Sequence, residues 1–290
     1  MKTPNKYRGI LFIMLAAFSF SCMNAFVRLA GDVPTIQKSF FRNAVAFLIA
    51  FVILFREHKG FRASSPSNWP ILFGRAAFGT VGLLANFYAV DHLLLSDASM
   101  LNKMAPFFAV IASYFILKEK INSVQALTLV GAFVGALLIV KPTFSNMVLV
   151  PSIIGLIGGL CAGTAYTLVR LLGTRGERGP FIVFTFSGLS CLVALPFLLF
   201  DYYPMSGQQF LALMGAGLAA AGGQFSVTAA YTNAPAREIS VYDYSQVIFS
   251  AILGFFLFHD IPDVYSFLGY VIIIGMALVS FRHNNRQKAA

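Results

Sequence analysis

Two stretches of the sequence decide the fold, and they align with each other without gaps. They are DASMLNKMAPFFAVIASYFILKE, residues 97–119, and EISVYDYSQVIFSAILGFFLFHD, residues 238–260. Each begins with an acid, continues as one apolar run, and ends in a basic or imidazole residue followed by an acid. Apolar letters alone match in any two membrane helices, but polar residues that coincide at both ends favour an internal repeat. We therefore interpret the two stretches as equivalent parts of two halves of the chain.

Each stretch is long enough to cross a membrane, because a helix needs about 20 residues to span the roughly 30 Å hydrocarbon layer. Eight further apolar runs of similar length surround them. The ten predicted spans are residues 9–29, 34–55, 69–90, 98–117, 123–140, 152–172, 180–200, 209–231, 239–258 and 264–281. Only short connectors and tails remain, so we expect no extramembrane domain.

The composition agrees with a membrane protein and excludes a soluble enzyme. Of the 290 residues, 58% are hydrophobic and 11% are charged, and the mean hydropathy is +0.77. A soluble domain carries about 25% charged residues. The net charge of +10 does not indicate nucleic acid as a partner, because the distribution of charge among the connectors explains it.

Positive charge gathers on one side of the predicted spans. If alternate connectors from the N-terminus face the cytoplasm, that side receives most Lys and Arg, whereas the other keeps Lys141, with Arg28 and Lys38 near span ends. Cytoplasmic connectors of membrane proteins carry such an excess. We therefore expect a protein integral to the bacterial cytoplasmic membrane, with both termini in the cytoplasm.

The repeat predicts an all-α integral membrane protein with ten transmembrane helices arranged as two inverted five-helix repeats. Five spans per half is an odd number, so the second half crosses the membrane in the opposite sense to the first. We place the halves at residues 1–143 and 144–290. Inverted repeats are typical of secondary transporters, in which the substrate lies near the bilayer midplane and the halves move to alternate access.

Four ionisable residues lie inside the predicted spans, where their cost in hydrocarbon marks them as candidate cavity residues. At 1.5 Å of rise per residue, Arg42 and Lys103 lie about 9 Å from the outer boundary, Arg75 about 9 Å and Asp243 about 6 Å from the inner one. Lys103 and Asp243 are then about 15 Å apart along the membrane normal. We therefore expect no direct ion pair but a charge near each end of one pathway. Snorkelling of the long side chains to the headgroups is the alternative.

Polar residues at helical spacing extend this set. In the third span, for example, Arg75 and Asn86 share a face with two glycines. Hydrogen bonding between helices is the competing explanation for any single polar residue, but several such stripes favour an aqueous cavity lined by spans one, three, four, eight and nine. The predicted binding residues are Asn24, Arg42, Arg75, Asn86, Asn102, Lys103, Gln224, Tyr231, Tyr242, Asp243, Tyr244 and Gln246. In span six, by contrast, Gly155, Gly159 and Gly163 predict close helix packing.

The chain resembles the drug/metabolite transporter superfamily, in its EamA-type ten-span branch. The strongest local matches are APFFAVIASYFILKEK at residues 105–120, where Pro106 precedes Glu119, and SQVIFSAILGFFLFHD at residues 245–260, where Val247 replaces that proline. SFFRN at 39–43, GRAAFG at 74–79 and the run from 239 look most like the branch with S-adenosylmethionine uptake carriers. The resemblance implies a carrier with a cavity on much the same helices, and a possible homodimer.

We therefore expect a secondary transporter that moves a small organic metabolite by alternating access, in contact with its solute and membrane lipid, without a cofactor or metal. The cations of the outer half favour a carboxylate, and Asp243 with the tyrosines of the inner half favours an amine, a sulfonium or a ring. A zwitterion, such as an amino-acid derivative or S-adenosylmethionine, satisfies both. Asp243, with Glu238 at the inner boundary, is a candidate proton carrier.

Two other classes of function are weaker alternatives. A channel repeats one ring of pore-lining residues, whereas the polar groups here are distributed unevenly over two halves. A membrane enzyme of the acyltransferase type is suggested only by His92 and Asp97, which have the HxxxxD spacing of a histidine base and its orienting acid. The three cysteines, Cys22, Cys161 and Cys191, match no disulfide framework or metal site.

Overall fold

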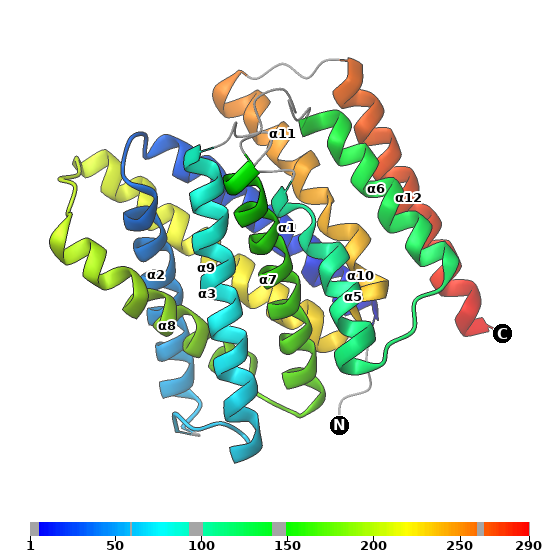
Figure 1. Ribbon diagram of the computed structural model, residues 1–290, viewed down its shortest axis with the longest axis horizontal. Helices are drawn as coiled ribbons and strands as arrows, with labels where there is room; N and C mark the ends of the chain where they lie inside the picture. The colour runs from blue at the N-terminus through cyan, green and yellow to red at the C-terminus, as the bar shows by residue number, and fades with distance from the viewer. Residues whose placement is uncertain (1–5, 59, 93–100, 141–148, 260–263, 290) are drawn as a thin grey trace.

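The computed structural model describes residues 6–58, 60–92, 101–140, 149–259 and 264–289. The regular elements in these ranges are helices, and each α-helix coincides with one of the ten predicted spans or with part of one, whereas the short η1 lies in the connector before the third span (Figure 1). The elements are α1 (Lys6–Leu29), α2 (Thr35–Arg56), η1 (Pro66–Asn68), α3 (Trp69–His92), α5 (Ala105–Leu117), α6 (Ser123–Val140), α7 (Leu149–Thr174), α8 (Gly179–Phe200), α9 (Gly207–Asn233), α10 (Ala236–Asp243), α11 (Ser245–Phe258) and α12 (Val264–Ala289).

The helices have the length and the surface of membrane spans. Seven helical stretches in the described residues are long and apolar enough to cross a membrane, counting Ala236–Phe258 as one, and Ala105–Leu117 and Ser123–Ile139 are shorter apolar helices. Large apolar side chains lie on the outside, among them Leu199 at 72% and Phe200 at 91% exposure. Such a surface is stable against lipid, and helices satisfy their own backbone hydrogen bonds there.

The fourth and ninth predicted spans are both broken, and they break at equivalent positions. In the ninth, Tyr244 separates α10 from α11; in the fourth, a turn at residues 103–104 precedes α5. Lys103 aligns with Tyr244 in the repeat. The two spans also end alike, because Lys118 and His259 both adopt left-handed backbone with φ of 57°. These matching irregularities are consistent with a duplicated fold.

Side chains of one half contact the backbone of the other half at the two breaks or beside them. The Tyr244 hydroxyl donates to the backbone carbonyl of Lys103 at 3.0 Å, across the repeat. Ser21 of α1 donates its hydroxyl to the backbone carbonyl of Gln246 at 3.0 Å. A helix can be interrupted at membrane depth only where protein supplies such partners, so each break depends on the other half of the chain.

The halves interlock instead of forming two separate bodies. Helix α1 packs against α9 and α11, and α7 packs in the matching way against α3 and α5. Two further pairs, α2 with α8 and α6 with α12, join corresponding helices of the two halves and lie at opposite sides of the bundle (Figure 1). The most extensive helix contacts are therefore made between the two halves.

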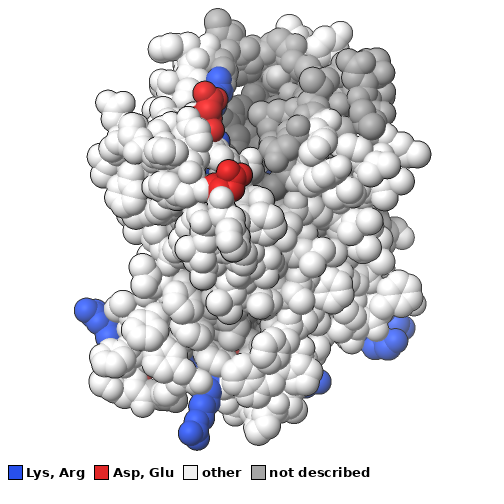
Figure 2. Space-filling model, turned by 60° about the vertical axis from the view of Figure 1, so that its left-hand side comes forward, with Lys and Arg blue, Asp and Glu red and all other residues white. Residues whose placement is uncertain are grey.

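The bundle has two chemically different ends. Helix α1 begins and α12 ends toward the lower end of the view in Figure 1. Figure 2 shows Lys and Arg gathered at that lower end, acidic side chains near the upper end, and a broad band without charge between them. This distribution fits a membrane protein whose lower end faces the cytoplasm.

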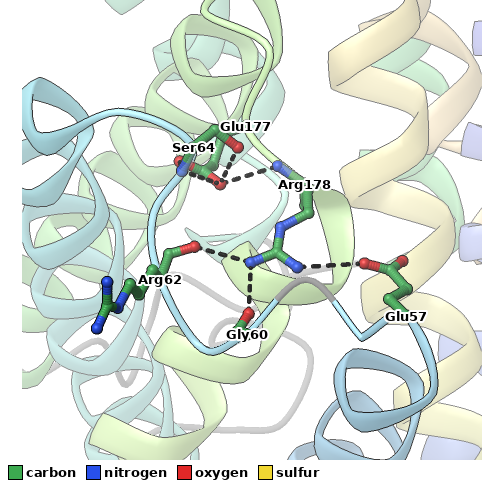
Figure 3. A network of polar contacts seen from close by, with 6 residues as sticks. All are labelled: Glu57, Gly60, Arg62, Ser64, Glu177 and Arg178. Atoms are coloured by element: carbon green, nitrogen blue, oxygen red, sulfur yellow. Dashed lines mark hydrogen bonds and ion pairs between the residues drawn. The ribbon is translucent and has the colours of Figure 1, made fainter.

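At the lower end, a buried carboxylate ties the α2–α3 connector to the α7–α8 connector (Figure 3). Glu177 is 6% exposed. Its oxygens accept hydrogen bonds from the backbone N–H of Ser64 at 3.0 Å, the Ser64 hydroxyl at 2.9 Å, the Asn68 side-chain amide at 2.9 Å and the backbone N–H of Arg178 at 3.0 Å. One side chain thus satisfies four donors from both halves.

Arg178 extends this network along the same connector. Its guanidinium donates to the carbonyls of Gly60 at 2.8 Å and Arg62 at 2.7 Å, and it lies 3.3 Å from the Glu57 carboxylate (Figure 3). At the upper end, the Gln37 side-chain amide exchanges two hydrogen bonds with the backbone of Tyr203, at 2.9 and 3.0 Å. The α2–α8 pair is therefore fastened at both ends.

The small-residue face of α7 allows close approach to α5, as the sequence predicts. A side-chain carbon at Gly163 would lie 2.6 Å from the carbonyl oxygen of Ala105 and 2.6 Å from the amide nitrogen of Ala109. At Gly159 it would lie 2.8 Å from the carbonyl oxygen of Leu101. The prediction of close packing at these glycines is confirmed.

Gly163→Ala should destabilise the protein, because the added methyl group collides with backbone that cannot move aside without separating α5 from α7. We expect a loss of about 1–3 kcal/mol, the usual cost of overpacking, measured as a lower midpoint of thermal unfolding in detergent. Gly275→Ala is the matched control, since a side-chain carbon there meets nothing within 4 Å. Equal midpoints for the two variants would contradict the packing argument.

Glu177→Ala should be more destabilising than Glu57→Ala. The first change leaves four donors without their acceptor, each costing about 1–3 kcal/mol if it stays buried. The second removes one contact of a carboxylate whose side chain is 32% exposed, and such pairs contribute at most about 1 kcal/mol. Thermal unfolding of both variants checks this, and a ranking in the reverse order would refute it.

Candidate functional site

A cavity of about 220 Å³ lies between helices of the two halves. Its walls come from α1, α2, α3, α7, α8, α9 and α11 and from the break before α5. Seven of the predicted binding residues line it: Asn24, Arg42, Arg75, Asn86, Asn102, Gln224 and Gln246. These residues lie on six different predicted spans, namely spans one to four, eight and nine. The structure brings them together around one cavity.

Arg75 of α3 is the most enclosed charge of the cavity, with 2% exposure. Its guanidinium carbon lies 4.2 Å from the centre of the Phe186 ring, and one guanidinium nitrogen lies 3.4 Å from the side-chain oxygen of Gln224. The guanidinium also crosses over Gly79, where any side chain would collide with it. The glycine one turn after Arg75 is thus what lets the arginine lie along its own helix.

Arg42 of α2 faces the same space. Its guanidinium carbon lies 6.0 Å from the centre of the Phe20 ring, a distance at which a cation is still attracted to the ring face. The Nε atoms of Arg42 and Arg75 are both buried without a hydrogen-bond partner. Within the described residues, neither arginine has a carboxylate partner.

Two arginines without an acid make this cavity electropositive. A buried charge is costly unless it is paired, and guanidinium groups bind planar carboxylates through two parallel hydrogen bonds. The side-chain amides of Asn24, Asn86 and Asn102 add neutral donors and acceptors around the arginines. The arrangement is suited to a small solute that carries a carboxylate or another anion.

The other predicted binding residues lie next to the cavity or away from it. Tyr231 is fully buried behind Tyr166, which lines the cavity; the two rings stack with centroids 5.0 Å apart and planes at 13°. Tyr244 contacts the break before α5, as described above. Tyr242 is buried in the apolar core of the bundle. Of these three, Tyr231 is therefore the one that supports the cavity wall.

The prediction that Lys103 and Asp243 lie about 15 Å apart is wrong. The Lys103 Nζ atom lies 3.9 Å from Asp243 Oδ2 and donates a hydrogen bond to Gln246 Oε1 at 2.7 Å. That prediction treated both spans as straight helices along the membrane normal. They enter from opposite ends and break at these residues, so the broken ends meet inside the bundle, and the long lysine stem spans the remaining gap.

Sequence reasoning missed several cavity residues. Tyr166 of α7 lines the cavity, as do Phe186 of α8 and Ser39 of α2. Tyr166 follows the glycines of its helix, whose spacing predicts close packing and nothing about a cavity. A tyrosine one turn after Gly163, inside an apolar span, is the signal that the sequence offers.

The two halves differ in a way that gives the cavity its direction. Helix α7 packs against α9, whereas the corresponding helices of the first half, α1 and α3, hardly touch. The cavity lies between α1 and α3, and Tyr166 of its wall stacks on the buried Tyr231. Two of its lining residues, Val27 and Lys38, lie near the end of α1 and the start of α2, which is the upper end of the bundle in Figure 1.

The features that suggested an enzyme form no site in the described part of the chain. The His92 ring stacks on Tyr88 at 4.1 Å, and its Nδ1 lies 2.9 Å from the Tyr88 carbonyl oxygen; Asp97 lies outside the described residues. Among those residues, no group of three His, Cys, Asp or Glu side chains could hold a metal. Cys22, Cys161 and Cys191 are free thiols.

Comparison with known proteins agrees with this geometry. The model of the EamA-like transporter family matches residues 7–141 and 150–282. The pseudopaline exporter CntI of Pseudomonas aeruginosa is 32% identical over 268 residues, which cover 92% of this chain and 93% of the exporter. The riboflavin transporter of Brucella anthropi is 26% identical, covering 94% and 98% of the two chains.

A solved crystal structure shows the same fold. It superimposes with a TM-score of 0.85 over 98% of this chain and 99% of its own, at 15% sequence identity. The family match covers both halves of the ten-span bundle, and the relatives with a stated function transport small metabolites. This chain therefore belongs to the EamA-like transporter family of the drug/metabolite transporter superfamily and is an integral membrane transporter, not an enzyme.

Proposed function

We propose that this protein carries a small organic anion or zwitterion with a carboxylate group across the bacterial cytoplasmic membrane by alternating access. The observation that carries the proposal is that Arg42 and Arg75 line one cavity and have no carboxylate partner among the described residues. A solute carboxylate supplies the missing charge. The amides of the cavity wall then select among solutes by hydrogen bonding.

The aromatic wall suits the remainder of such a solute. Phe20, Tyr166 and Phe186 line the cavity, and aromatic rings accept flat rings or cationic groups. Amino-acid derivatives and S-adenosylmethionine combine a carboxylate with a group of this kind. The names of two relatives, a pseudopaline exporter and a riboflavin transporter, also fit an organic solute of moderate size.

The mechanism follows from inverted halves, which we place at residues 1–143 and 144–290. With both termini in the cytoplasm, the cavity faces the outside and the Tyr166–Tyr231 stack closes the cytoplasmic path. In the opposite state, α1 and α3 would close and α7 and α9 would separate. A solute or a co-transported ion biases the exchange between the two states only if it binds them with different affinity. The homodimer that the family resemblance implies remains a prediction.

A thermal-shift screen in detergent tests the substrate class. The panel contains amino acids, organic acids, nucleosides, S-adenosylmethionine and quaternary amines. A compound at 100 times its dissociation constant stabilises the protein by about 2.7 kcal/mol. We expect stabilisation by carboxylates, and in Arg42→Met and Arg75→Met about ten- to hundredfold weaker binding, because a hydrogen bond to a charged group contributes about 1.5–3 kcal/mol.

Arg175→Met is the matched control, because Arg175 is exposed beyond the end of α7. It should bind the same compounds as the unchanged protein. The proposal would be wrong if only amines without a carboxylate stabilise the protein, or if both cavity variants bind carboxylates with unchanged affinity.

A further inference from the structure

The wall of the cavity carries positive charge that no acid of the wall balances. Arg42 and Arg75 line it within the bundle, and Lys38 lines it near the upper start of α2, where its Nζ atom donates to the carbonyl of Gly31 at 2.6 Å. None of the lining residues that the structure describes is Asp or Glu. A solute with one negative charge would therefore neutralise one of the two inner arginines and leave the other unpaired.

Asp243, the acid expected to contact a cationic group of the solute, is already paired within the protein. It does not line the cavity, and its Oδ2 lies 3.9 Å from the Nζ atom of Lys103. Lys103 also donates to Gln246, a residue of the cavity wall. The lysine and the acid cancel each other's charge behind this wall, so the pair leaves the positive balance of the cavity unchanged.

The phenylalanine faces of the cavity are taken up by the protein's own cations. The guanidinium carbon of Arg42 lies 6.0 Å from the centre of the Phe20 ring, and that of Arg75 lies 4.2 Å from the centre of the Phe186 ring. A cationic group of a solute would have to compete with the guanidinium groups for these faces. It would also meet two like charges, so the cavity disfavours an amine or a sulfonium.

The two arginines have different anchors and lie at different depths. At 1.5 Å of rise per residue, the Cα atom of Arg42 is about 10 Å from the upper start of α2, and that of Arg75 about 9 Å from the lower start of α3 (Figure 1). The Arg75 guanidinium extends over Gly79, one turn higher, and interacts electrostatically with that of Arg42. Arg75 is further held by Gln224 of α9. The cavity therefore offers two neighbouring cationic positions, one above the other.

The size of the cavity limits the solute that can reach both positions. Its volume of about 220 Å³ lies below the roughly 300–1,000 Å³ of pockets for drug-sized ligands. Guanidinium groups bind planar carboxylates through two parallel hydrogen bonds. A short carbon chain with a carboxylate at each end matches both the volume and the two separate cations.

We propose that the cavity binds a short organic dianion whose two carboxylates contact Arg42 and Arg75 separately. The inference rests on the proposed function and narrows its substrate class from any carboxylate, zwitterions included, to dicarboxylates without a cationic group. One carboxylate binds Arg42 at the upper position and the other binds Arg75 at the lower one. The bound solute then brings the inner charge of the cavity to zero.

Calorimetric titration of the purified full-length protein in detergent at pH 8 tests the number of carboxylates. The ligands are malonate, succinate, glutarate and adipate, each compared with its own monoamide. Carboxyl groups are ionised at this pH, so the monoamide keeps the shape of the diacid and loses one charge. We expect at least one diacid to bind about ten- to hundredfold more tightly than its monoamide, because each carboxylate adds hydrogen bonds to a charged group.

Substitution of either arginine should remove this preference. In Arg42→Met and in Arg75→Met, the ratio of the two affinities should fall to about one, because one cation remains for one carboxylate. The monoamide should lose affinity in at most one of the two variants. Arg175→Met, at an exposed side chain, should keep the ratio of the unchanged protein. The comparison of diacid with monoamide in the unchanged protein does not depend on the folding of any variant.

Inorganic phosphate distinguishes two separate positions from one clamp, because it carries its charge on a single centre. It should bind no more tightly than the monoamides. The inference would be overturned if phosphate binds as tightly as the best diacid, or if every diacid and its monoamide bind equally and both weaken in each arginine variant. The two arginines would then hold one anionic group, and the proposed carboxylate carrier would stand. Absence of binding by all four diacids would also overturn the inference, and the wider panel would then decide on the carrier.

Discussion

The structure depends on one constraint: a helix that is interrupted within a membrane must have its freed backbone groups satisfied by protein. Here the partners come from the other half of the chain. Tyr244 donates a hydrogen bond to the carbonyl of Lys103 in the turn before α5, and Ser21 of α1 contacts the carbonyl of Gln246 in the first turn of α11. Because lipid supplies no hydrogen bonds, the two breaks must lie against each other and against α1. That requirement brings Lys103, Asp243 and Gln246 together and sets one side of the cavity.

Glycines at two places then determine how closely the helices and the charged side chains pack around the breaks. The glycines of α7 allow its approach to α5 and to the first break. Gly79 likewise lets Arg75 lie along α3 against Phe186. The cavity thus contains two guanidinium groups that have no carboxylate partner among the described residues. Each lies near a phenylalanine ring, and under the proposed function a solute anion completes the site.

Much of the fold could be predicted from the sequence, because each property that fixes it is local. Apolar length gives the spans, and the ends of two aligned runs give the repeat. The sidedness that connector charge indicates stays a prediction. The family match and the solved relative agree with an all-helical bundle of ten spans. Seven of the proposed binding residues also meet at one cavity, because polar residues on a span have few other places to face. Whether they bind solute stays a prediction.

The tilt of the helices and the positions at which two of them are interrupted could not be predicted from the sequence. The distance between Lys103 and Asp243 was overestimated because a straight helix was assumed, and the proline that hints at a break in the first half is replaced by Val247 in the second. Tyr166 was missed for a related reason, since the face that a residue turns to a cavity depends on the crossing of its helix with others. These are properties of pairs of helices, and no single span encodes them.

The fastening of α2 to α8 at both ends has a mechanical consequence. Glu177 and Arg178 hold the lower connectors, and Gln37 holds the upper one. In a carrier that works as proposed, the α2–α8 pair acts as the hinge between the two halves. The displacement of helices between the two states is then smallest beside this pair and increases with distance from it. Arg42, on α2, then moves little between the two states, whereas α1 and α7 are displaced relative to it. A solute bound to Arg42 would keep its contact with this arginine while the other side chains around the solute change.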